Sequence, residues 1–290
     1  MPEQANAQPI PEAPARVPAG YLYFVVAALL LCFGQYILWM LDRWWNDEYY
    51  GHGLLVPIIS GFLLYRKKDE IAAQPSTGHA LGLPVIVAGI LMHLVATWWD
   101  VNFGSGFALI LTMFGAMIWL YGLPATRAAA FPLAYLAFGV PMARMLVDQF
   151  AMPLQIFSAQ FGAFFATAIG IPTVREGTVV HIPEYTFEVA IVCSGLKSAI
   201  AMTALGALYA YMVDAAMWKR VTIVILSVPV ALFANGSRIA LTLILGRVFG
   251  SKAAEGFFHE ASGMFVFLMA LIGLFIVGTV LKCSKIRDDI

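Results

Sequence analysis

The chain has 290 residues, of which 61% are hydrophobic and only 12% charged, and its 17 lysines and arginines balance its 17 aspartates and glutamates. Soluble domains are about half apolar and carry roughly a quarter charged residues, so this composition predicts a polytopic membrane protein and excludes an ordinary soluble domain. A net charge of zero without long basic runs gives no electrostatic basis for binding nucleic acid. The three cysteines lack CxxC spacing, so we expect no disulfide framework, no metal site and no cofactor.

The two ends of the chain differ from the apolar remainder. Residues 1–19 are rich in proline, alanine and glutamine and lack the basic start of a signal peptide, so we predict a disordered cytoplasmic tail. Residues 20–283 are expected to form a single transmembrane domain. Residues 284–290 are expected to be a second cytoplasmic tail.

Apolar stretches that suit a hydrocarbon core of roughly 30 Å recur from Tyr21 onward. The candidate spans are 21–41, 53–66, 80–97, 104–121, 128–141, 153–171, 190–212, 221–246 and 260–281. Lysine and arginine clusters place both termini in the cytoplasm, which requires an even number of crossings. The stretch 128–141 is short and closed by Pro141, which favours a broken or interfacial helix there. We therefore predict an all-α bundle of about eight transmembrane helices.

An outer loop precedes the span 190–212. Residues 172–189 alternate apolar and polar side chains around Pro183-Glu184, which predicts a short extracytoplasmic β-hairpin-like loop. Such a loop has a strand edge that could bind an extended peptide, or it could simply cover the bundle. The predicted orientation puts this loop, the start of span 190–212 and the joint 247–259 on the outer side.

Polar residues gather where the span 190–212 begins, in Val192-Cys193-Ser194-Gly195-Leu196-Lys197-Ser198. A thiol becomes a nucleophile as the thiolate, which a helix N-terminus and a cation such as Lys197 favour. Ser194 could hydrogen-bond the helix start, and Gly195 would let another backbone or a substrate approach closely. The alternative is that Cys193 is a small buried apolar residue, which is how we interpret Cys32.

Two more polar positions fall at the same predicted depth. Arg238 lies about 27 Å beyond Arg220 along its helix, and His259 precedes the outer start of the last one. Asn235 and Arg238 share a helix face and could donate to a developing oxyanion, while His259 could move a proton. Alternatively, Arg238 snorkels to the interface and His259 is merely solvated there.

Several motifs occur together in chain order. They are Tyr50-Gly51-His52-Gly53-Leu54-Leu55-Val56-Pro57, Gly170-Ile171-Pro172 with Arg175-Glu176-Gly177, Cys193-Ser194-Gly195, Asn235-Gly236-Ser237-Arg238, and His259 with Gly263. In these residues the chain resembles the exosortase/archaeosortase family of membrane-embedded cysteine transpeptidases. One departure is Ile191-Val192, where the family often has Glu-Ala, so in this chain Glu188 would supply the acidic group instead.

This resemblance implies a single catalytic domain over residues 20–283. Cys193 would attack a peptide carbonyl and form a thioester, His259 would move the proton, and Arg238 would steady the thiolate or oxyanion. Supporting or substrate-binding positions are Asn235, Ser194, Gly195, Lys197 and Glu188. The implied substrates are secreted precursors with a C-terminal sorting signal, which consists of a Pro-Glu-Pro-like motif (PEP-CTERM-like), one transmembrane helix and a basic tail. Cleavage would occur at the periplasmic face of a bacterial inner membrane, and the acceptor is left open.

Other classes of protein are also compatible with parts of the pattern. A small-molecule transporter or permease could line its substrate path with Arg238 and Asn235, although such proteins usually show internal repeats and none is evident. A structural or lipid-handling membrane protein would use no thiol chemistry. A metal-dependent intramembrane protease would need a motif such as HExxH, which the sequence lacks.

Overall fold

The computed structural model describes residues 18–74, 77–190, 193–250, 257–283 and 285–287, without the side chains of Ala19, Arg144 and residues 257–262. Of the predicted tails, residues 1–17 of the first and residues 284 and 288–290 of the second lie outside the described residues. Within the second tail, Ile286 forms an antiparallel bridge with Val213, so this part of the chain is held against the helical body.

Each apolar stretch predicted to cross the membrane is helical. The helices are α1 (Ala19–Asn46), η1 (Gly51–Leu54), α2 (Leu55–Arg66), α3 (Lys68–Ala73), α4 (Gly82–Trp98), α5 (Asn102–Ala128), α6 (Ala130–Tyr135), η2 (Leu136–Gly139), α7 (Arg144–Ala168), α8 (Leu196–Met212), α9 (Met217–Phe249) and α11 (Phe257–Val280). Among the described residues, 4 helices are long and apolar enough to cross a membrane: Gly20–Asn46, Asn102–Ala128, Met217–Phe249 and Gly263–Val280. The chain is thus a helical multi-pass membrane protein. The expected number of about eight crossings stays a prediction.

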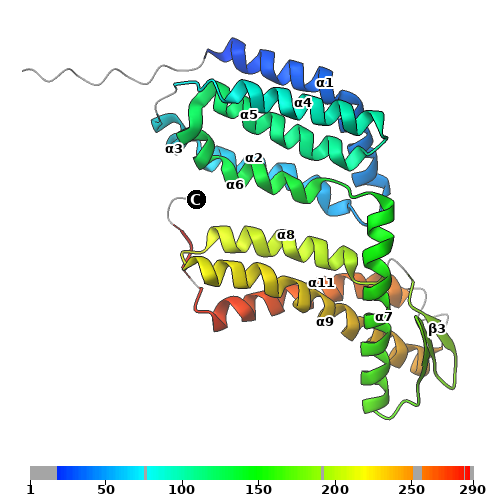
Figure 1. Cartoon of the computed structure of the whole chain (residues 1–290). Coiled ribbons are helices and arrows are strands. Elements are labelled where there is room, and N and C mark those ends of the chain that lie inside the picture. The colour runs from blue at the N-terminus through cyan, green and yellow to red at the C-terminus, as the bar shows by residue number, and fades with distance from the viewer. Residues whose placement is uncertain (1–17, 75–76, 191–192, 251–256, 284, 288–290) are drawn as a thin grey trace, which may run out of the picture.

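The helices form two groups (Figure 1). Helices α1, α4 and α5 lie together with α2 and α6 beside them, while α8 and α11 pack against α9. Figure 1 also shows the start of α1 and the end of α11 at one end of the molecule, with the sheet at the other. This arrangement agrees with the expectation that both termini lie on one side of the membrane.

Helix α7 differs from the sequence-based expectation. The stretch 153–171 was expected to cross the membrane, but α7 runs across the other long helices rather than alongside them (Figure 1). It is also absent from the helices that are long and apolar enough to span. Its buried positions include Gln155 and Ser158, whose polar groups favour packing against protein over exposure to lipid. The stretch 128–141 is broken as expected, into α6 and η2.

A small antiparallel sheet follows α7. Its strands are β1 (Val174–Glu176), β2 (Val179–His181) and β3 (Thr186–Glu188), in the order β1-β2-β3. The predicted hairpin around Pro183-Glu184 is confirmed as the β2–β3 connection, and β1 adds a third strand. Val180 and Phe187 are buried beneath the sheet, so it closes over the helical core at this end.

Candidate active site around Cys193

Cys193 lies between β3 and the first residue of α8, and only 2% of it is exposed. It belongs to an apolar cluster formed by the sheet, α7 and α9. The larger buried members of this cluster are Ile171, Val180, Ile182, Phe187, Val189, Ile239 and Leu243. The sheet therefore helps to bury the thiol, and the thiol precedes α8 rather than lying within a membrane-spanning helix.

Arg238 of α9 lies close enough to Cys193 to act on its side chain. The Arg238 guanidinium hydrogen-bonds the Cys193 side chain and acts on it through its charge. Burial raises the pKa of the Cys193 thiol, and the nearby guanidinium opposes this by favouring the thiolate. In the described part of the chain, the buried Nη2 of Arg238 has no hydrogen-bond partner, so it is available to a bound group.

Asn235 also contacts Cys193, but through the backbone. Its Nδ2 donates to the carbonyl oxygen of Cys193 and to Oγ of Ser158, each at 2.9 Å. Both amide hydrogens are thus engaged, so the resting geometry differs from the expected oxyanion donor. Asn235 and Arg238 do share a helix face. Asn235 binds the backbone of Cys193, and Arg238 acts on its thiol.

Ser194 and Gly195 shape the turn into α8. Oγ of Ser194 accepts a hydrogen bond from the backbone N–H of Leu196 at 3.3 Å, which places the hydroxyl at the helix start as expected. Gly195 has φ +90°, in the left-handed region, and a Cβ there would lie 3.0 Å from Nδ2 of Asn235. Glycine is therefore needed here both for the backbone conformation and for the close approach of α9.

We expect Gly195→Ala to reduce both folding and activity. An alanine in the left-handed region costs about 1–2 kcal/mol, and its methyl group would press on the Asn235 amide. The thermal midpoint of the detergent-solubilised protein should fall, together with precursor cleavage per folded molecule. Gly170→Ala is a suitable control because φ there is +86° but no atom lies within 4 Å of the added Cβ. Equal loss of activity in both variants would show that backbone strain alone accounts for the effect.

Lys197 and Glu188 are both exposed, whereas the Cys193 thiol is buried. Lys197 is exposed in the first turn of α8, where its charge acts on His52. Burial lowers the pKa of His52, and the charge of Lys197 acts in the same direction. Glu188 is exposed, whereas its neighbours Phe187 and Val189 are buried in the cluster around the cysteine. Because side chains alternate along a strand, Glu188 faces away from that cluster.

His259 lies in the first turn of α11, but its side chain is outside the described part of the chain. Its approach to Cys193 therefore stays a prediction. Ile191-Val192, which depart from the family pattern, also lie outside the described residues.

Sequence reasoning missed the contribution of the turn between α1 and α2. Tyr49 and Tyr50 pack in a cluster with Leu196, and the charge of Glu48 acts on Cys193. This turn is tied to the rest of the bundle by Tyr50, whose hydroxyl accepts a hydrogen bond from the backbone N–H of Met142 at 3.0 Å. The motif Tyr50-Gly51-His52-Gly53 was a signal that the segment mattered, but nothing local showed that it lies beside the cysteine.

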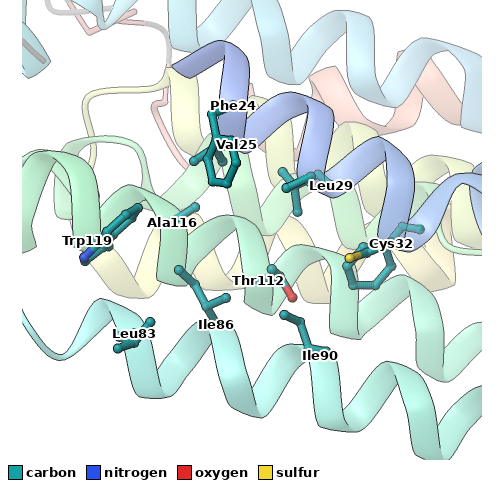
Figure 2. A pocket seen from close by; sticks show the side chains of 12 residues that line it. Phe24, Val25, Leu29, Cys32, Leu83, Ile86, Ile90, Thr112, Ala116 and Trp119 are labelled. Atoms are coloured by element: carbon teal, nitrogen blue, oxygen red, sulfur yellow. The ribbon is translucent and has the colours of Figure 1, made fainter. Parts of the chain in front are cut away.

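Two cavities differ in their relation to this site. A cavity of about 490 Å³ is lined by Tyr49 and Tyr50, by apolar side chains, and by the polar residues Arg43, Asp47, Asp100 and Asn102. An apolar cavity of about 240 Å³ lies between α1, α4 and α5 and includes Cys32 (Figure 2). The residues that line this cavity with Cys32 are apolar apart from Thr112 and the indole N–H of Trp119, which agrees with the interpretation of Cys32 as an apolar residue.

The fold and the site define a helical multi-pass membrane protein with a buried cysteine beside an arginine. A family model described as transmembrane exosortase, EpsH type, matches residues 44–276. The match covers most of the chain, so this protein belongs to the transmembrane exosortase family. The matched range contains the turn between α1 and α2, the sheet, Cys193, Arg238 and His259. No curated protein sequence and no solved structure matches the chain.

Proposed function

We propose that this exosortase is a membrane-embedded cysteine peptidase and transpeptidase with Cys193 as nucleophile. It would cleave the C-terminal sorting signals of secreted precursors at the periplasmic face of the bacterial inner membrane. The observation that carries the proposal is the contact between the Arg238 guanidinium and the Cys193 thiol. A cation beside a thiol favours the thiolate, which is the reactive form.

The proposed chemistry has two halves. The Cys193 sulfur attacks the scissile carbonyl carbon, and the unpartnered Nη2 of Arg238 donates to the oxyanion that forms. The C–N bond then breaks, the leaving amine takes a proton from His259, and a thioester remains. In the second half an acceptor with an N–H or O–H group gives its proton to His259 and attacks the thioester. The C–S bond breaks and the Cys193 thiolate is restored.

The placement of the site supports a substrate from the outer side of the membrane. Figure 1 shows the sheet at the end of the molecule away from the start of α1 and the end of α11. With about eight crossings and cytoplasmic termini, that end faces the periplasm. A precursor held by its own transmembrane helix would present the residues just outside the membrane at this depth. Membership of the exosortase family supports this reading over a transporter.

The covalent intermediate gives a direct test of this function. Membranes with the wild-type enzyme are mixed with a tagged precursor that ends in a Pro-Glu-Pro motif, one transmembrane helix and a basic tail, and are then quenched in acid. We expect an enzyme–precursor adduct that neutral hydroxylamine releases, because hydroxylamine cleaves thioesters. Cys32→Ala should keep the adduct and Cys193→Ala should lack it. A precursor that is shortened by the wild-type enzyme without any adduct on Cys193 would argue against the thioester.

A further inference from the structure

Buried polar side chains of α7 hold the backbone on both sides of Cys193. Gln155 donates from Nε2 to the carbonyl of Val189, and Ser158 donates from Oγ to the carbonyl of Ser194 at 3.1 Å. Gln155 is 6% exposed and Ser158 is 0% exposed. Their spacing of three residues places them on one face of α7, toward the segment that carries the cysteine.

Asn235 of α9 completes this network. Its Nδ2 donates to the carbonyl of Cys193 and to Oγ of Ser158. The Ser158 hydroxyl therefore accepts from Asn235 while it donates to Ser194, which uses its single proton and one lone pair. Helices α7 and α9 are thus joined to each other and to the cysteine segment by the same few side chains.

The cysteine segment needs these donors because it lies before α8 and its carbonyls are not paired within that helix. Helix α8 begins at Leu196, and the carbonyl of Gly195 accepts from Ala199 N at 2.8 Å. The carbonyls of Val189, Cys193 and Ser194 receive their side-chain donors from α7 and α9 instead. A buried carbonyl left without a donor costs about 1–3 kcal/mol, so the network determines where this backbone can lie.

We propose that Gln155 and Ser158 of α7, acting with Asn235, are positioning residues that hold the Cys193 backbone so that the thiol stays against Arg238. These residues contact the backbone and leave the reacting atoms to Cys193, Arg238 and His259. In this role, α7 lies across the bundle because its polar face supports the nucleophile. The inference deepens the proposed function and rests on it for the reaction that is measured.

The first test compares variants that remove these donors with matched variants elsewhere. Ser158→Ala and Gln155→Met are expected to lower kcat for the tagged precursor by about 10- to 100-fold per folded enzyme, with KM nearly unchanged, because a displacement of about 1 Å is enough for such a loss. Ser158→Thr keeps the hydroxyl and should restore most of the activity.

Two controls separate positioning from general destabilisation. Ser60→Ala removes another buried serine, which lies on α2 and donates from Oγ to the carbonyl of Pro132 on α6 at 2.7 Å. This variant should leave kcat per folded enzyme unchanged. Gln160→Met alters an exposed glutamine of the same helix α7 and should also leave kcat unchanged. An equal fall in kcat in Ser60→Ala would overturn the proposal, as would wild-type kcat in both Ser158→Ala and Gln155→Met.

A second readout does not depend on precursor cleavage. In a background where Cys32 and Cys283 are alanine, a membrane-impermeant maleimide is added from the outer side. Ser158→Ala and Gln155→Met should label at Cys193 severalfold faster than the parent, because the buried thiol is released from its position, while Ser60→Ala should label at the parental rate. Unchanged labelling in both α7 variants would overturn the positioning role. If the wild-type enzyme fails to cleave the precursor, the proposed function fails, and the labelling rates still decide the role of α7.

Discussion

Cys193→Ala is expected to abolish precursor cleavage, with a fall of about 10³-fold or more per inserted enzyme, because the thioester cannot form without the sulfur. The change is small in volume and the residue lies in an apolar cluster, so the fold should tolerate it. The measurement is the fraction of a co-expressed tagged precursor that is shortened, normalised to the amount of enzyme in the membrane.

The other cysteines provide controls with different surroundings. Cys283 is 1% exposed and therefore matches Cys193 in burial, whereas Cys32 is exposed on α1. We expect Cys283→Ala and Cys32→Ala to cleave the precursor as the wild type does. A stably inserted Cys193→Ala enzyme that still shortens the precursor would disprove the cysteine mechanism.

Arg238→Ala is expected to lower cleavage by about 10²- to 10³-fold, because it removes the cation that favours the thiolate and a donor to the developing oxyanion. Arg238→Lys should recover only part of the rate, since an ammonium lacks the planar fork that contacts two groups at once. Burial raises the pKa of Cys193 and Arg238 opposes it, so removing Arg238 leaves burial unopposed. The midpoint of Cys193 alkylation should therefore move to higher pH.

Arg247 offers a matched control on the same helix. It is partly exposed and pairs with Glu184 of the β2–β3 connection at 3.3 Å. Arg247→Ala should change neither the alkylation midpoint nor the cleavage rate by more than a few fold. If Arg238→Ala leaves the alkylation midpoint at its wild-type value, the contact with the thiol has no electrostatic effect in the membrane.

The sequence predicted the helices well because each depends on its own composition. Long apolar stretches must form helices in lipid, where backbone groups have no water to bond, so a helix covers most of each expected stretch. The largest differences are at α7, which begins at Arg144 rather than 153, and at α5, which ends at Ala128 rather than 121. The direction of α7 was not predictable in this way. Its hydrophobicity resembles that of a weak span, and only its packing against α9 shows that it lies across the bundle.

In the candidate site, too, local spacing was predictable from the sequence and contacts between distant residues were not. The spacing of Asn235 and Arg238 placed both on one face of a helix, and the structure brings that face to Cys193. The role of the Asn235 amide in holding the backbone was not visible, since it depends on Ser158, which is 77 residues away in the chain. Gln155 and Ser158 lie in no recognisable motif, so no local signal pointed to them.

By itself, the sequence determined that this protein resides in a membrane, where its helices lie along the chain, and which side chains are able to carry out thiol chemistry. These properties follow from hydrophobicity and residue type, which each segment possesses before it meets any other. Only the tertiary structure decided which residues meet around the thiol, that α7 supports the nucleophile, and that the turn between α1 and α2 lies beside it. Contacts between distant segments depend on how whole helices pack, and short-range patterns carry little information about that geometry.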